Sequence, residues 1–337
     1  MKVLSRVGYN LPIKLFYGEN NPPFVSSNMR CSKCHRKAVT YIRYNGTHLC
    51  REHFLEYVRR RVKKDIKKQG IIDRNSVIGV AVSGGKDSLV TLHLLHEVLS
   101  DRRGNKLVAI TVDEGIKGYR DKSIRFAIEN CEKLDVEHHI VSFKELIGYA
   151  LDEIVSIKRD ERGPCTYCGV FRRQCLNRKA KEIGVTILAT GHNLDDMAQS
   201  ALMNFIKGDI EKIARMGPHT RIQPGLIPRL IPLRGIPEKE TTLFALLEDI
   251  KYHDGVCPYA TEAFRGIFRD IVEELEYKHP GARHGILKSY EIIKELLFAT
   301  HPLQPTQPCE RCGEPTSQRI CKACILLEEL EKSREKI

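Results

Sequence analysis

A glycine-rich turn, Ser83-Gly84-Gly85-Lys86-Asp87-Ser88, joins an apolar segment at 77–82 to a helical stripe of leucines that starts at residue 89. Glycines let a backbone turn tightly and bring its N–H groups close to phosphate oxygens, and the helix that follows adds positive potential. Asp87 stands where the Walker A pattern requires Ser or Thr, and the G-x-G-x-x-G pattern also fails. We therefore expect a phosphate-binding loop of another kind, with a plain capped strand-to-helix turn as the alternative.

Two adjacent carboxylates, Asp195 and Asp196, follow Gly191 at the start of another predicted helix. Such residues are common as helix caps, which is one interpretation. In the other they face the nucleotide, and Asp196 is then the preferred metal-binding or catalytic carboxylate.

Twelve cysteines in a chain without an unbroken apolar leader favour metal binding in a reducing compartment over disulfides. Two modules have the ligand spacing of closed zinc sites, which stabilise folding and leave no open position for chemistry. The predicted zinc ligands are Cys31, Cys34, Cys50 and His53 in the first module, and Cys309, Cys312, Cys321 and Cys324 in the second. His35 and His48 are alternatives to His53.

A third group combines the pair Cys165-x2-Cys168 with the distant Cys257. Three thiolates suit a [4Fe–4S] cluster that keeps one iron free of protein ligands. A persulfide relay through a transient disulfide, or a zinc ion, are the alternatives. Cys175 lies seven residues beyond Cys168, about 10 Å along a helix, so we expect it and Cys131 to be core residues.

Short apolar segments alternate with helical patterns between residues 76 and 300. The expected strands are 77–82, 107–112, 136–143, 185–190 and a proline-interrupted one within 226–233. The expected helices are 54–69, 89–99, 124–134, 146–155, 169–183 and 195–205, with a mainly helical region at 239–299. This alternation predicts an α/β fold with a doubly wound parallel sheet, flanked by N- and C-terminal zinc fingers. Ligands bind beyond the carboxyl ends of such strands, where Ala81, Val112, Asp113 and Gly191 stand.

The chain of 337 residues carries 55 Lys+Arg against 43 Asp+Glu, a formal charge of +12 that suggests a polyanionic partner. Its 42% hydrophobic residues exclude wholesale disorder, and no apolar run approaches the roughly 18–20 residues of a membrane span. We expect a cytoplasmic protein without membrane partners. The predicted regions are an extension at 1–28, a zinc finger at 29–58, a basic linker helix at 59–75, a catalytic domain at 76–300, and a zinc ribbon with a helical tail at 301–337. Translation starting at Met29 is an alternative to a docking role for 1–28.

The order of these motifs resembles the tRNA 2-thiouridine synthetases, a group of PP-loop ATP pyrophosphatases that includes the TtuA and cytoplasmic tRNA 2-thiolation types. The resemblance covers residues 29–330. It rests on SGGKDS, VDEG at 112–115, CTYCG at 165–169, TGHNLDD at 190–196, Cys257 and both cysteine modules.

The resemblance implies that ATP is cleaved to AMP and pyrophosphate to adenylate the C2 oxygen of a uridine, which sulfur then replaces. It implies Mg²⁺, a [4Fe–4S] cluster on Cys165, Cys168 and Cys257, and two zinc ions. The sulfur source would be a ubiquitin-like thiocarboxylate protein or free sulfide, and a homodimer or heterodimer is a further expectation. The implied ATP and Mg²⁺ residues are Ala81, Val82, Ser83, Gly84, Gly85, Asp87, Ser88, Val112, Asp113 and Gly191. The implied catalytic residues are Asp196, Lys86 and Arg172.

Arg172 would hold the α-phosphate, with a solvated or tRNA-facing arginine as the alternative. The basic run at 59–68 would hold the tRNA backbone.

Three segments, at 112–121, 165–173 and 257–266, are most similar to the branch that modifies the wobble uridine. Glu262, Phe264 and Arg265 follow the third cysteine, so they would lie near the reacting base, or else merely pack a helix. We therefore expect 2-thiolation of the wobble uridine in tRNAs for Lys, Glu and Gln. The alternatives are the T-loop uridine, a PP-loop tRNA ligase without sulfur chemistry, and a non-catalytic zinc-finger RNA-binding protein.

Overall fold

The computed structural model describes residues 29–100, 102, 104–157, 163–218, 225–260, 265–300 and 305–335. The predicted extension at 1–28 lies outside these residues, as do Glu262 and Phe264. Contacts divide the chain into two compact units, Met1–Tyr57 and Val58–Ile337. The finer regional boundaries proposed from the sequence stay a prediction.

The described part of the first unit is built around one hairpin, in which β1 (Thr40–Ile42) pairs antiparallel with β2 (Thr47–Leu49). The helix α1 (Arg51–Gln69) begins directly after the hairpin. Leu49 and Phe54 are fully buried, so they supply the small apolar core of this unit.

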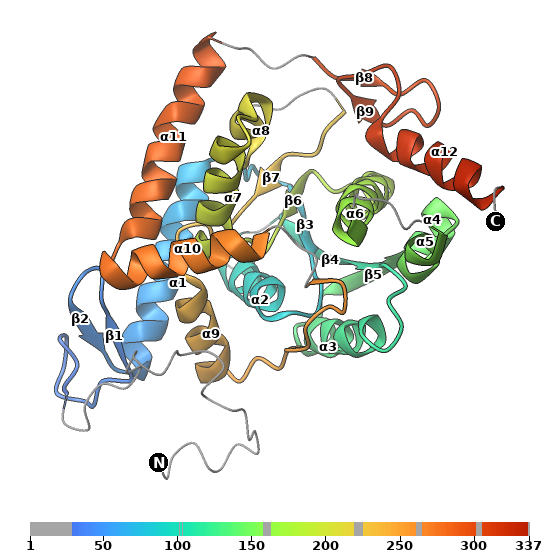
Figure 1. Cartoon of the computed structure of the whole chain (residues 1–337). Coiled ribbons are helices and arrows are strands. Elements are labelled where there is room, and N and C mark those ends of the chain that lie inside the picture. Colours follow the sequence, from blue (N-terminus) through green and yellow to red (C-terminus); the bar gives the residue numbers. More distant parts are fainter. Residues whose placement is uncertain are drawn as a thin grey trace. The chain divides into compact units, whose positions relative to one another are not determined.

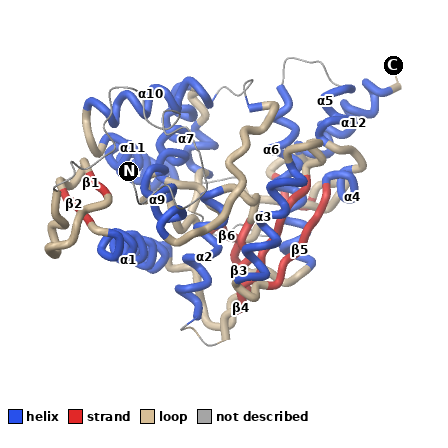
Figure 2. Tube along the Cα trace, turned by 90° about the horizontal axis from the view of Figure 1, so that it is seen from below, coloured by secondary structure: helices blue, strands red, loops and turns tan. Residues whose placement is uncertain are grey.

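The second unit contains a five-stranded parallel sheet with the order β5-β4-β3-β6-β7. The strands, red in Figure 2, are β3 (Val77–Ala81), β4 (Lys106–Asp113), β5 (Glu137–Ser142), β6 (Ile187–Ala189) and β7 (Arg229–Leu230). The predicted doubly wound parallel sheet is confirmed. The last strand is only two residues long, and the flanking prolines Pro228 and Pro232 have no N–H to donate to a ladder.

Helices cover both faces of this sheet. In Figure 1, α3 (Arg120–Lys133) lies below the strands, while α6 (Gly163–Glu182) lies above them. The helix α2 (Lys86–Ser100) packs on β3 and β4, and α4 (Phe143–Ile147) packs on β5. From β3 the chain adds β4 and then β5 on one side of that strand. It then crosses back and adds β6 on the other side of β3. The switch point at which such sheets bind ligands therefore lies between β3 and β6.

The predicted helix at 146–155 is divided in two. The first piece, α4, begins with a capping box between Ser142 and Glu145 and ends at Gly148, which has a left-handed conformation. The second piece is α5 (Leu151–Ile157). The sequence pattern missed this break because apolar residues continue at helical spacing across Gly148.

Further helices complete the part of the second unit that follows β6 in the chain. They are α7 (Leu194–Ile206), α8 (Ile210–Arg215), α9 (Glu238–Leu247), α10 (Arg265–Lys278) and α11 (Ala282–Thr300), of which α8 was not predicted. A hairpin of β8 (Gln307–Pro308) and β9 (Pro315–Thr316) leads to α12 (Lys322–Arg334), which packs on α5 and α6. Within the described residues, no helix is long and apolar enough to cross a membrane.

Candidate active site

The predicted phosphate loop connects β3 to α2 and turns at Gly84. Gly84 has a φ of +82°, a region that favours glycine. A Cβ atom built there would lie 1.8 Å from the carbonyl oxygen of Ser123 in α3. The loop backbone therefore packs directly on α3, and no larger residue fits at this position.

Two serines close the loop. Ser88 Oγ donates to the Gly85 carbonyl at 2.8 Å and accepts from the Ser83 amide at 3.1 Å. Ser83 Oγ in turn accepts from the Gly85 amide at 3.3 Å. These bonds hold the loop as a compact turn at the N-terminus of α2, where helix N–H groups favour a phosphate.

Lys86 and Asp87 point toward α9. Lys86 Nζ lies 3.0 Å from both carboxylate oxygens of Asp87 and 3.4 Å from Glu238 Oε1. Thr241 Oγ1 donates to Asp87 Oδ1 at 2.7 Å. Burial alone would lower the pKa of Lys86, but Asp87 and Glu238 outweigh that effect and raise it, so the amine stays charged. Glu238 and Thr241 were not predicted from the sequence, because no local motif marks them.

Gly191 brings the end of β6 against the phosphate loop. A Cβ atom built there would lie 2.8 Å from Asp87 C and 2.8 Å from Ser88 N. The 190–196 turn therefore lies beside the loop, as expected for neighbouring strands that end at the same edge of a sheet. Asp113, at the end of β4, accepts a hydrogen bond from the Gly115 amide at 2.9 Å.

Asp196 acts first as a helix cap. Its backbone amide donates to Asn193 Oδ1 at 3.0 Å, and its Oδ2 accepts from the Asn193 amide at 3.2 Å, which together form a capping box. Its other oxygen, Oδ1, lies 3.3 Å from Arg265. A catalytic or metal-binding role for Asp196 stays a prediction.

Asp195 is more deeply buried and links two helices. Its Oδ1 lies 2.8 Å from Arg283 Nε in α11, and its Oδ2 accepts from the Glu238 amide at 2.8 Å, which caps α9. Asp195 therefore fixes the helix that carries Glu238 and Thr241 beside the loop.

Glu114, in the VDEG segment, received no role in the sequence analysis, yet its side chain is only 4% exposed. Its Oε2 lies 2.6 Å from Arg120 Nε, and its Oε1 lies 2.7 Å from Arg172 Nε. Arg172 is about half exposed and donates from Nη2 to Cys168 Sγ at 3.0 Å. The sequence offered one signal for Glu114, a charged residue directly after an apolar strand.

Cys165 and Cys168 lie in the first two turns of α6, which begins at Gly163 and not at the predicted residue 169. Burial raises the pKa of Cys168 to about 11, and Arg172 opposes this rise. Cys165 is exposed, and its Sγ lies 3.8 Å from the carbonyl oxygen of Tyr259. The segment after Cys257 therefore reaches the first turn of α6.

Both predicted zinc modules assemble their ligands. A tetrahedral zinc with Zn–S bonds of about 2.3 Å separates two sulfurs by about 3.8 Å. The observed separations are 3.8 Å between Cys34 and Cys50 and 3.9 Å between Cys309 and Cys324. All four ligand atoms of each module lie within 4.8 Å of one another. The sulfurs of Cys165, Cys168 and Cys257 form no such group within the described residues.

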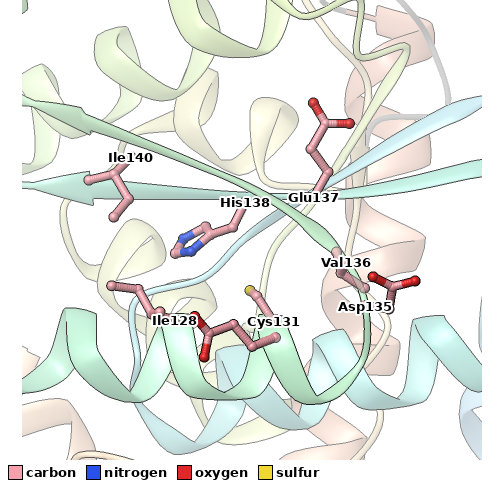
Figure 3. Close-up of a pocket in the computed structure, with 8 residues that line it drawn as sticks. Ile128, Cys131, Asp135, Val136, Glu137, His138 and Ile140 are labelled. Carbon is pink, nitrogen blue, oxygen red and sulfur yellow. The ribbon is translucent and has the colours of Figure 1, made fainter.

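The two cysteines expected in the core are buried there. Cys131 lines a hollow between α3 and β5 together with His138 and Ile140 (Figure 3). Cys175 is fully buried on the inner face of α6. Burial raises the pKa of both thiols to about 12, so neither offers a thiolate at neutral pH.

The basic run at 59–68 is only partly available to a polyanion. Arg59 lies 2.7 Å from Glu97 and 3.0 Å from Glu248. Arg61 pairs with Glu240 in the same way. The exposed members of the run are Arg60, Lys63, Lys64, Lys67 and Lys68. These five side chains are the members of the run that are open to a polyanion, and the contact of the run with tRNA stays a prediction.

Comparison with known proteins gives matches that cover most of the chain. Residues 54–275 match the PP-loop domain family, residues 307–337 a zinc-ribbon family, and residues 30–55 the N-terminal LIM domain of the 2-thiouridine synthetase TtuA. The tRNA 2-thiolation protein NcsA of Haloferax volcanii is 40% identical over 321 residues, which cover 90% of this chain and 99% of that protein. The cytoplasmic tRNA 2-thiolation protein 1 of Candida glabrata is 38% identical over 324 residues, 94% of this chain and 90% of that protein.

Among solved structures, the chain is similar to the U34-tRNA thiolase NcsA from Methanococcus maripaludis with its [4Fe–4S] cluster. The TM-score is 0.79 at 38% sequence identity, and the match covers 90% of this chain and 96% of that one.

Proposed function

The chain belongs to the tRNA 2-thiolation proteins built on a PP-loop domain, and from this membership we propose that it is an ATP-dependent tRNA uridine 2-sulfurtransferase. Its substrate would be the wobble uridine of tRNAs for Lys, Glu and Gln. The resemblance identified in the sequence is thereby confirmed at the level of the family.

One observation carries this proposal: the nucleotide loop and the cysteine pair belong to one polar network. Arg120 donates to the Ser83 carbonyl at 2.9 Å, and Glu114 joins Arg120 to Arg172, which donates to Cys168. A ligase without sulfur chemistry gives no reason for cysteines beside an ATP site. An RNA-binding protein without catalysis gives no reason for the loop.

The loop residues provide the chemistry of activation. ATP would adenylate the C2 oxygen of uridine, which turns a poor leaving group into AMP. Lys86, kept charged by its neighbours, and the N–H groups of 83–88 would stabilise the negative charge on the departing pyrophosphate. Asp87, held by Lys86 and Thr241, and the partly exposed Asp196 are the carboxylates that would bind Mg²⁺.

Cys165, Cys168 and Cys257 would hold a [4Fe–4S] cluster. In a cluster each cysteine binds a different iron, so the sulfurs lie farther apart than around one zinc ion. Within the described residues the three sulfurs do not gather within 4.8 Å as the zinc ligands do. When bound, the cluster supplies one iron without a protein ligand, where sulfide can be held. Arg172 would then orient the Cys168 sulfur, and its contact with the α-phosphate is a further part of the proposal.

The sulfur would come from a ubiquitin-like thiocarboxylate protein or from free sulfide. The persulfide relay is the second candidate mechanism; it would need a persulfide donor that already carries sulfane sulfur, which Cys165, exposed next to the buried Cys168, would accept by thiol exchange. We further propose that two zinc ions occupy the closed modules, that the protein works as a homodimer or heterodimer, and that the reaction takes place in the cytoplasm. The exposed basic residues of α1 would contact the tRNA backbone.

Mass spectrometry of tRNA from a deletion strain tests the proposed substrate. We expect 2-thiouridine to disappear from the wobble position and to return when the gene is restored. Loss of the thiolated T-loop uridine with the wobble position unchanged would select the alternative substrate and leave the chemistry intact. Unchanged thiolation at both positions would refute the function.

A further inference from the structure

A buried carboxylate lies between two arginines at the carboxyl edge of the sheet. Glu114 follows β4 directly, Arg120 is the first residue of α3, and Arg172 lies in α6. Since α3 and α6 cover opposite faces of the sheet (Figure 1), Glu114 joins the two helical layers. The two carboxylate oxygens lie 2.6 Å from Arg120 Nε and 2.7 Å from Arg172 Nε.

Arg120 carries this connection to the phosphate loop. Its side chain is 5% exposed. Its Nη1 donates to the Ser83 carbonyl at 2.9 Å and to Ser123 Oγ at 2.8 Å, and its Nη2 donates to the Val112 carbonyl. The same Ser123 supplies the backbone against which Gly84 packs. Arg120 therefore fixes both the loop and the surface on which the loop rests.

Arg172 carries the connection to the cysteines. Its Nη2 donates to Cys168 Sγ at 3.0 Å, although its side chain is 48% exposed. A half-exposed arginine has many rotamers open to it, and a buried carboxylate with fixed geometry selects one of them. Glu114 is the acidic residue in contact with Arg172 among the described residues, so it decides where the guanidinium points.

We propose that Glu114 is a positioning residue shared by the two halves of the site, holding the phosphate loop through Arg120 and the hydrogen bond to the Cys168 sulfur through Arg172. The second half of this inference depends on the proposed cluster, whereas the first half does not. Hydrogen bonds and positive charge near a ligand sulfur raise the reduction potential of an iron–sulfur cluster. A single carboxylate therefore tunes both ATP affinity and cluster potential.

The variant Glu114→Asp separates position from charge, because it keeps the negative charge but is one methylene too short to reach both arginines. Two quantities are measured: the Kd for ATP by calorimetry on cluster-free protein, and the midpoint potential of the anaerobically reconstituted cluster. We expect ATP binding about tenfold weaker. We also expect the reduction equilibrium constant to fall about tenfold, which is about 59 mV for one electron. Arg172→Met should lower the potential in the same direction.

The matched control is Asp65→Asn, which removes another partly buried carboxylate paired with an arginine. Asp65 Oδ2 lies 3.6 Å from Arg234 Nε. We expect it to lower the thermal stability without changing ATP affinity or cluster potential. If Glu114→Asp does not fold, Glu114→Gln, which keeps the side-chain length but removes the charge, is measured for ATP affinity, and Arg172→Met is measured for the cluster potential.

An ATP affinity or a cluster potential equal to the wild-type value in the folded variant overturns the shared role. A wild-type protein that binds no cluster refutes the cluster in the proposed function instead. The ATP measurement then decides the inference: wild-type affinity in the variant overturns it, and weakened affinity leaves Glu114 as the residue that positions the loop.

Discussion

A methyl group added at Gly191 tests whether the end of β6 sets the position of the phosphate loop. In Gly191→Ala the new Cβ atom would lie 2.8 Å from Asp87 C and Ser88 N and 2.9 Å from Asp87 O. All three are backbone atoms of the first turn of α2, which cannot rotate away as a side chain can. The φ of Gly191 is not in the left-handed region, so alanine adds no backbone strain of its own. Any change in stability or rate in this variant therefore comes from the steric clash of the new methyl group.

The size of the effect follows from the contact distance. Ordinary contact begins at 3.4 Å, so the loop and the strand must separate by about 0.6 Å. Forcing an extra methyl group into a packed site costs about 1–3 kcal/mol of stability. A displacement of about 1 Å at a reacting group lowers rates by about a hundredfold, so we expect a loss of about tenfold to a hundredfold in tRNA-dependent AMP formation.

The assay is the release of AMP and pyrophosphate in the presence of tRNA, with thermal unfolding measured on the same samples. The control is Gly285→Ala in α11, where the new Cβ meets nothing within 4 Å. That change should raise helix stability by up to about 1 kcal/mol and leave AMP formation unchanged. A Gly191→Ala protein with wild-type ATP affinity and rate would show that the loop is not held by this contact.

Three further results are expected. Cys257→Ala should lose iron and thiolation activity while Cys175→Ala keeps both, and full activity in an iron-free preparation would favour the persulfide relay. Metal analysis should find about two zinc ions per chain, and Cys309→Ala should lower thermal stability more than ATP affinity; one zinc with both modules folded would contradict the assignment. Burial lowers the pKa of His138 from 6.5 to about 4. Between these pH values the unfolded chain binds a proton that the folded protein does not bind, so the free energy of unfolding should fall as the pH drops from 6.5 to about 4. His138→Gln should flatten that fall in a denaturation series, and an unchanged slope would refute the assignment to His138.

The parts of the site that could be predicted from the sequence are those whose residues lie close together along the chain. The loop at 83–88 and the two zinc modules depend on spacing along the chain, and short spacing fixes geometry locally. The parallel sheet was predictable for a related reason, since apolar strands that alternate with helices have few other arrangements. The break at Gly148 was missed because one glycine does not interrupt the apolar pattern on either side.

The parts that the sequence could not reveal come from contacts between distant segments. Glu238 and Thr241 contact Lys86 and Asp87 from a helix far along the chain, and Asp195 helps to hold the start of that helix by accepting from the Glu238 amide. The adjacent carboxylates Asp195 and Asp196 also make different contacts, which the sequence does not show. Asp195 is buried against Arg283, while Asp196 completes the capping box and reaches Arg265.

The position of the cysteine pair follows from topology more than from its local motif. In a doubly wound sheet, a helix that follows a strand begins at the carboxyl edge, whichever face it then covers. The phosphate loop begins α2 after β3, and Cys165 and Cys168 begin α6, the helix that precedes β6. The start of α2 and the start of α6 therefore both lie at the carboxyl edge of the sheet, although the two helices cover opposite faces. Glu114, at the end of the strand between them, is the residue that can contact both layers, which is why a single carboxylate joins the ATP loop to the cysteine pair.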